Sequence, residues 1–204
     1  MNTQKVKVWD PLLRIFHWAL VTLFLFAFIT EDDFLNLHAI AGYLIIGLIA
    51  FRLIWGVIGP RHARFTDFVT SPTKVKAYLK DVLLFRAKHY MGHNPAGGAM
   101  VIALLASIAM TTLFGLLTYG AMEFSGPLAG MVSGVGDNIA HGFEEAHGFF
   151  ANFTLLLVAL HVVGVVVASL QHHENLVRSM IDGYKQVEAS EPEAQAINRN
   201  EVTQ

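Results

Sequence analysis

Apolar residues in this chain gather in four long runs, and polar segments separate them. The runs cover about residues 12–30, 37–58, 98–119 and 148–170. Each is long enough for an α-helix to cross a bilayer core, which takes about 20 predominantly apolar residues. The pattern predicts an all-α, integral membrane four-helix bundle. We expect one transmembrane domain over residues 1–185, followed by a polar tail over residues 186–204.

The charged residues beside these runs divide by sign. All fourteen Lys and Arg lie before or at the start of the first run, from the end of the second run to the third, or after the fourth. The other two loops hold acids and no cation: Glu31, Asp32 and Asp33 in one, and Glu123, Asp137, Glu144 and Glu145 in the other. The positive-inside rule therefore predicts that both termini and the 60–97 segment are cytoplasmic.

Composition narrows the chemistry. Hydrophobic residues make up 54% of the chain and charged residues 15%, against about 25% charged in a soluble domain. These values argue against a small soluble enzyme and exclude a disordered chain. The chain has no cysteine, which removes disulfides, iron–sulfur clusters, zinc–thiolate sites and covalent c-type haem. The net charge of −2 gives no sign of a nucleic-acid partner, and we expect none.

Four of the ten histidines fall within or at the ends of the runs, where an ionisable side chain is costly and suggests function. His147 and His161 share the fourth run and are 14 residues apart. On a helix this spacing is roughly 21 Å along the axis and about 40° around it, so both point the same way at two depths. His17 in the first run matches the cytoplasmic depth of His161, and His38 in the second matches the outer depth of His147.

Two bis-histidine sites stacked across the membrane suit two b-type haems, which need no cysteine and sit non-covalently in a bundle core. Glycine and alanine in the second and fourth runs would let a flat ring approach, although small residues also serve plain helix packing. Zinc fits less well, because two histidines without a nearby acid leave it under-coordinated. Packing or hydrogen bonding remains the alternative role for a single membrane histidine. Solvation at the interfaces adequately explains five more histidines: His62, His89, His93, His172 and His173. His141 is six residues before His147 and so lies on a different helix face, outside the ligand set.

Several motifs, in this order, resemble the prokaryotic cytochrome b561 family, which includes the b-type cytochrome subunits of nickel–iron hydrogenases. The motifs are WDPLLRIFHW at 9–18, LHAIAGY at 37–43, FRLIWG at 51–56, GHNP at 92–95, the two histidines of the fourth run, and HENLVRSM at 173–180. The resemblance covers about residues 8–184. It implies a four-helix diheme membrane cytochrome of the bacterial inner membrane, whose ligands come from the first, second and fourth helices.

The resemblance also implies roles for individual residues. His17 and His161 would bind the cytoplasmic-side haem iron, and His38 and His147 the outer-side iron. Arg52 matches an arginine that family members place near a haem propionate, and Arg14 is a second candidate. A cation there would neutralise a buried carboxylate. The outer side offers no Lys or Arg for this purpose.

We expect the protein to carry electrons between the quinone pool and a periplasmic redox partner, such as a c-type cytochrome, a hydrogenase or another dehydrogenase. It would then be an electron-transfer subunit rather than a self-contained enzyme. A quinone shares the membrane and exchanges protons together with electrons. One alternative is a stand-alone superoxide:quinone oxidoreductase, which the absence of outer cations disfavours. Another is a non-redox, histidine-containing transporter, for which the runs offer few polar residues.

Overall fold

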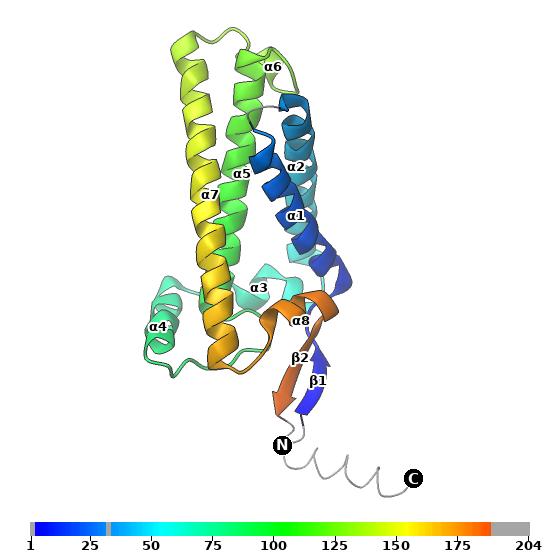
Figure 1. Cartoon of the computed structure of the whole chain (residues 1–204), viewed down its shortest axis with the longest axis vertical. Coiled ribbons are helices and arrows are strands. Elements are labelled where there is room, and N and C mark those ends of the chain that lie inside the picture. The colour runs from blue at the N-terminus through cyan, green and yellow to red at the C-terminus, as the bar shows by residue number, and fades with distance from the viewer. Residues whose placement is uncertain (1–2, 32–33, 189–204) are drawn as a thin grey trace, which may run out of the picture.

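The computed structural model describes residues 3–31 and 34–188 of the chain (Figure 1). Four long helices dominate: α1 (Pro11–Ile29), α2 (Leu35–Ile58), α5 (Pro95–Met122) and α7 (Asp137–Gln171). The shorter elements are β1 (Thr3–Lys7), the 3₁₀ turn η1 (Arg61–Ala63), α3 (Phe65–Phe68), α4 (Pro72–Leu83), α6 (Ala129–Val132), α8 (Leu176–Asp182) and β2 (Tyr184–Glu188).

The four predicted spans are confirmed as helices that are long and apolar enough to cross a membrane. Local sequence explains where two of them begin. The Asp10 side chain caps α1 by accepting from the Leu13 amide, and Asn94 caps α5 by accepting from Gly97. In both helices a proline follows the cap, where its missing N–H and fixed φ cost nothing.

The fourth helix is longer than the hydropathy pattern indicated. It begins at Asp137 rather than near residue 148, and its 35 residues give a length of about 52 Å, well beyond the roughly 30 Å hydrocarbon core. Its added turns are stabilised by contact rather than by lipid, because Ala140 packs with Val132 of α6 and Ala121 of α5. His147 therefore lies ten residues inside the helix instead of at its start.

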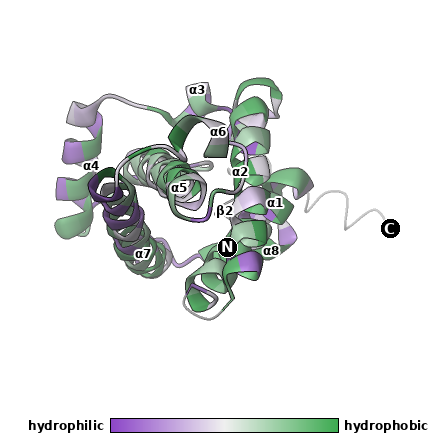
Figure 2. Ribbon diagram, turned by 90° about the horizontal axis from the view of Figure 1, so that it is seen from above, coloured by the Kyte–Doolittle hydropathy of each residue, from purple (hydrophilic) through white to green (hydrophobic). Residues whose placement is uncertain are grey.

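The long helices form two closely packed pairs. α5 packs along α7, α1 packs along α2, and α2 contacts α5. Seen from above, α7 and the α1–α2 pair lie on different sides of α5 (Figure 2). The apolar core between the pairs includes Ala41, Ile45 and Ile108. The helix with two of the four selected histidines, α7, thus packs chiefly along α5 rather than along α1 or α2.

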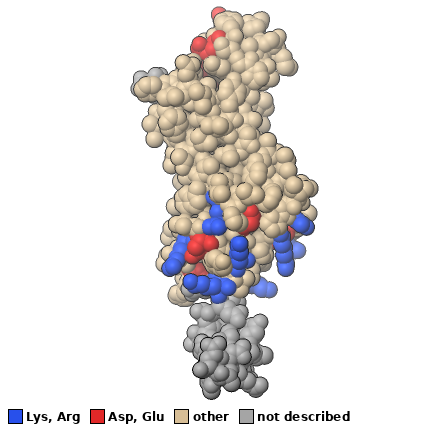
Figure 3. Space-filling model, turned by 90° about the vertical axis from the view of Figure 1, so that its right-hand side faces the viewer, with Lys and Arg blue, Asp and Glu red and all other residues tan. Residues whose placement is uncertain are grey.

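One end of the molecule carries the basic residues, and we call it the basic end. It is formed by β1, β2, α3, α4 and α8, and both described chain ends lie there (Figure 1). Lys and Arg side chains gather over it on the face drawn in Figure 3, with acidic side chains among them, while the opposite end shows acidic side chains without cations. The structure thus gathers the cations seen on this face at one end of the bundle.

The terminal segments form a structure that the hydrophobic pattern did not predict. β1 and β2 pair antiparallel, with Thr3 opposite Glu188 and Lys7 opposite Tyr184. Beyond the ladder, the amides of Val8 and Trp9 donate to the Gly183 carbonyl at 2.9 and 3.1 Å. The predicted polar tail begins within β2, and its residues 189–204 lie outside the described part of the chain.

Candidate functional site

His38 of α2 and His147 of α7 face each other near the opposite end of the bundle. Their ring centroids are 5.8 Å apart. The Nδ1–H of His38 donates to the Ala27 carbonyl of α1, and the Nδ1–H of His147 donates to the Thr111 carbonyl of α5, both at 2.9 Å. Two helices that carry neither histidine therefore fix the orientation of the two rings.

These hydrogen bonds also determine which nitrogen of each ring is protonated. A carbonyl oxygen can only accept, so Nδ1 must carry the hydrogen, and in a neutral imidazole Nε2 then keeps a free lone pair. Metal-binding histidines typically have this arrangement, with the second nitrogen donating to a carbonyl or carboxylate. Gly115 leaves room for the His147 ring in this position, because a Cβ on residue 115 would lie 3.0 Å from the ring.

His17 of α1 and His161 of α7 form a second facing pair, nearer the basic end. Their ring centroids are 6.4 Å apart. The Trp18 ring meets the edge of the His17 ring with centroids 5.1 Å apart. Nδ1 of His17 is buried, and no hydrogen-bond partner for it occurs among residues 3–31 and 34–188. The structure thus brings the four histidines together in the two pairs expected from their depths.

The spacing within each pair fits one metal ion between two imidazoles. Two metal–nitrogen bonds of about 2 Å each, with roughly 1 Å more to each ring centre, separate the centroids by about 6 Å. The glycines of α2 and α7 leave open space beside these helices, because a Cβ on Gly42, Gly47 or Gly164 would meet nothing within 4 Å. Within the described residues, no group of three or more His, Cys, Asp or Glu could hold a metal ion. The donor sets are therefore two nitrogens each, as a porphyrin iron requires from its axial ligands.

Arg52 lies in the core at the basic end. It is 2% exposed, and its guanidinium sits over the Phe65 ring at 4.7 Å from the centroid. Its Nη1 is buried and has no partner in the part of the chain that the structure describes. A buried cation of this kind favours an anionic ligand, since burial without a partner is costly.

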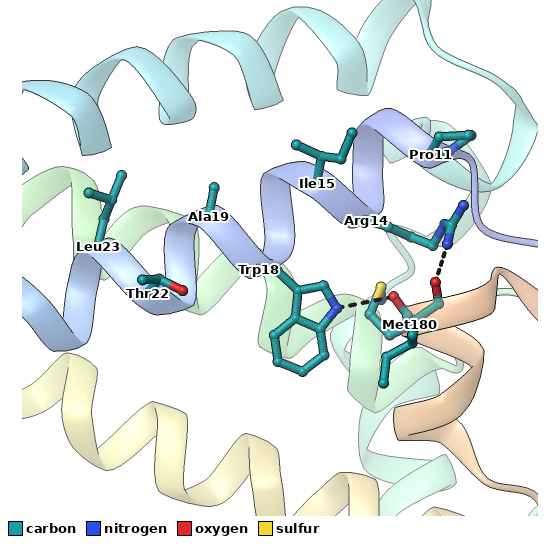
Figure 4. A pocket seen from close by; sticks show the side chains of 9 residues that line it. Pro11, Arg14, Ile15, Trp18, Ala19, Thr22, Leu23 and Met180 are labelled. Carbon is teal, nitrogen blue, oxygen red and sulfur yellow. Dashed lines mark hydrogen bonds between the residues drawn. The ribbon is translucent and has the colours of Figure 1, made fainter.

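Arg14 has a different environment, on the face of α1 that lies beside α8. Its Nη1 donates to the Ile181 carbonyl, and Trp18 donates to the Met180 carbonyl at 3.2 Å. Both side chains turn toward α8 and line a groove of about 590 Å³ that follows α1 (Figure 4). The contact with Ile181 joins Arg14 to the C-terminal segment.

The expectation that His93 is solvated at the interface was wrong. Its ring lies between those of Trp9 and Phe68, with centroids 4.7 and 4.6 Å away. His141 is exposed and pairs with Glu144 at 3.1 Å. His89 pairs with Glu174 and packs on His172. The GHNP motif was a signal for His93, but its aromatic neighbours are distant in sequence and meet only in the fold.

The fold and the paired histidines define the class of molecule: a helical integral membrane protein with the features of a b-type membrane cytochrome. The family described as prokaryotic cytochrome b561 matches residues 8–183. The chain belongs to this family. It is accordingly a membrane b-type cytochrome, with haem b as its cofactor and electron transport as its role.

Two curated relatives are similar to most of the chain. A probable Ni/Fe-hydrogenase B-type cytochrome subunit of Rhizobium leguminosarum bv. viciae is 25% identical over 90% of this chain and 90% of its own length. A protein of the same description from Bradyrhizobium diazoefficiens is 26% identical, over 73% of this chain and 65% of its own length. No solved structure gives a significant match.

Proposed function

We propose that this protein is the diheme cytochrome subunit that carries electrons across the inner membrane between the quinone pool and a periplasmic redox partner. The observation that carries the proposal is the pair of facing histidine pairs, with ring centroids 5.8 and 6.4 Å apart. One haem b in each pair supplies a reversible one-electron carrier. Two carriers at two depths would connect the two membrane surfaces.

The ligand assignment follows from the same contacts. His38 and His147 hold the outer-side iron, with Ala27 and Thr111 orienting the rings through Nδ1. His17 and His161 hold the cytoplasmic-side iron, near the basic end. Arg52 contributes a buried positive charge to the cytoplasmic-side haem. Arg14 is also proposed for a propionate, although its Nη1 already donates to Ile181.

The proposed partners follow from the relatives and from the membrane setting. Both relatives are described as Ni/Fe-hydrogenase cytochrome subunits, which favours a hydrogenase over a c-type cytochrome or another dehydrogenase. A quinone would be the mobile partner in the bilayer. With the basic end in the cytoplasm, as the positive-inside rule directs, the acidic opposite end would meet the periplasmic protein and favour a basic surface on it.

The test is a reduced-minus-oxidised absorption spectrum of the purified protein, together with a count of haem per chain. We expect a b-type α-band and two haems. His161→Ala should remove mainly the cytoplasmic-side haem, and His38→Ala mainly the outer-side haem, because each variant breaks a different histidine pair. His141→Ala is the matched control on α7, since its exposed side chain faces Glu144. Loss of both haems from each single variant would refute the pairing.

The hydrogenase proposal needs a separate test. Membranes that contain the full chain and its partner should reduce both haems when hydrogen is added. A quinone should then reoxidise them. Rapid reduction of quinone by superoxide with the isolated protein, and no response to hydrogen, would instead favour the stand-alone oxidoreductase.

A further inference from the structure

Two buried nitrogen atoms at the basic end, Nη1 of Arg52 and Nδ1 of His93, have no hydrogen-bond partner among the described residues. Buried polar groups are nearly always paired, and an unpaired one costs about 1–3 kcal/mol. Two such atoms near the same aromatic ring therefore point to a ligand that both of them bind. Phe68 links them, because the Arg52 guanidinium lies 5.9 Å and the His93 ring 4.6 Å from its ring centroid.

The charge of Arg52 specifies what the ligand must supply. Guanidinium stays protonated in proteins, and no ion pair joins Arg52 to any carboxylate in the described ranges. Asp10 lies near enough to favour the positive charge electrostatically, but it forms no hydrogen bond with Arg52: its Oδ1 accepts from Trp55 Nε1 at 3.2 Å and from the Leu13 amide at 3.0 Å, and its Oδ2 has no partner among the described residues. The Phe65 and Phe68 rings attract the cation but cannot accept a hydrogen bond from Nη1 as an oxygen does. An anionic acceptor would complete the environment of this nitrogen.

His93 contributes an uncharged donor. Burial, with Arg52, Lys185 and His161 nearby, lowers the pKa of His93 to about 3, so its ring is neutral at physiological pH. Trp9 and Phe68 fix the plane of the ring from two directions. A neutral imidazole has one N–H to donate, and the anion beside Arg52 is the group to which it can donate.

We propose that His93 is a positioning residue for the haem held by His17 and His161, and that it donates to the propionate carboxylate already assigned to Arg52 under the proposed function. The inference rests on the proposed function, because it requires haem in that pair. A carboxylate meets both requirements: it neutralises the cation and accepts from the neutral ring. A quinone carbonyl would meet only the second, since it carries no charge.

The test uses the full chain in lipid nanodiscs and measures two properties of each haem. Redox titration gives its midpoint potential, and resonance Raman spectroscopy follows the propionate bending mode, which responds to hydrogen bonds at the carboxylate. Removing a cation or a donor near a propionate stabilises ferric over ferrous iron. Arg52→Gln should therefore raise the ferric-to-ferrous ratio of the cytoplasmic-side haem about tenfold at fixed potential, a fall of about 59 mV.

His93→Phe should change the ratio in the same direction by a smaller factor and shift the propionate mode of that haem alone. Arg52→Lys retains the charge and His93→Gln retains a donor, so both should keep most of the native potential and propionate mode. Such recovery would show that the first two variants do not act through misfolding. The outer-side haem is the internal control. His62→Phe is the matched control, because that ring already has a partner at 3.0 Å in Asp67.

The outcomes distinguish this inference from the proposed function on which it rests. A chain without haem contradicts the proposed function. A chain with both haems, in which Arg52→Gln and His93→Phe leave the potential and the propionate mode unchanged, overturns the inference alone. Unchanged spectra and potentials combined with slower quinol oxidation would also overturn it, because the two donors would then bind a quinone.

Discussion

At the scale of single residues, a hydroxyl pair joins the two most closely packed helices. Ser107 of α5 and Thr154 of α7 lie 2.7 Å apart, and Thr154 is fully buried. The Thr154 hydroxyl also contacts the Phe150 carbonyl at 2.8 Å within its own helix. Interhelical hydrogen bonds of this kind stabilise membrane proteins by about 0.6–2 kcal/mol. The pair fixes the register of α5 on α7, and hence the depth of His147 relative to Thr111.

Thr154→Val should therefore destabilise the protein by about 1 kcal/mol, because it leaves the Ser107 hydroxyl without its partner on α7. Reversible denaturation in detergent, followed by circular dichroism, measures the change. Thr118→Val is the control, since that hydroxyl bonds only to the Phe114 carbonyl of its own helix. A Ser107→Ala, Thr154→Val double variant that costs the full sum of the singles would show that the two hydroxyls do not interact.

At this scale the sequence predicts the histidine pairs but not the surroundings of every histidine. The pairing of His147 with His38, and of His161 with His17, could be predicted because helix geometry fixes both the depth and the direction of residues 14 apart. The environment of His93 could not. Trp9 and Phe68 are 84 and 25 residues away in the sequence, and only the folded ends of the helices bring the three rings together.

At the scale of elements, a buried ion pair ties the terminal ladder to the loop between α7 and α8. Lys185 of β2 lies 3.5 Å from Glu174 and donates to the Tyr90 carbonyl at 3.0 Å. Both charged side chains are nearly buried, at 7% and 10% exposed. Burial lowers the pKa of Lys185, and Glu174 opposes that shift. The carboxylate is therefore what keeps this ammonium charged against its burial.

Glu174→Gln should loosen the ladder by about 2 kcal/mol, because it leaves the Lys185 ammonium with less compensation. Hydrogen exchange of the β1 and β2 amides measures the local opening. Adding Lys185→Met should recover part of the loss, since the unpaired charge is then removed as well. Asp81→Asn, in the exposed pair with Arg86, should have almost no effect. Equal exchange in all of these variants would show that the pair does not hold the ladder.

At the scale of the whole molecule, the distribution of charge and the positions of the chain termini both distinguish one end of the bundle from the other. The described Lys and Arg gather at the end that holds β1, β2, α4 and α8, and the acidic loops lie at the other (Figure 3). Because β1 and β2 are paired, the two ends of the described chain must lie on the same side of the membrane. The orientation of one terminus therefore fixes that of the other.

The absence of cysteine makes this orientation easy to test. Ser133→Cys, in the exposed segment after α6, should react with a membrane-impermeant maleimide in intact spheroplasts. Ser71→Cys, exposed before α4, should react only after the membrane is permeabilised. The cysteine-free parent is the control and should not be labelled. The reverse labelling pattern would place the basic end outside and contradict the proposed orientation in the membrane.

The sequence by itself determined the four spans, the segregation of charge and the family, because hydropathy, charge sign and ordered motifs are properties of short segments. It also determined which histidines share a depth, because helix geometry is regular. Tertiary structure decided the rest. The extension of α7 to Asp137 depends on contacts with α6, and the β1–β2 ladder joins segments nearly 180 residues apart. The unpaired donors of Arg52 and His93 exist only where α2, α3 and the segment before α5 meet, so packing alone could reveal them.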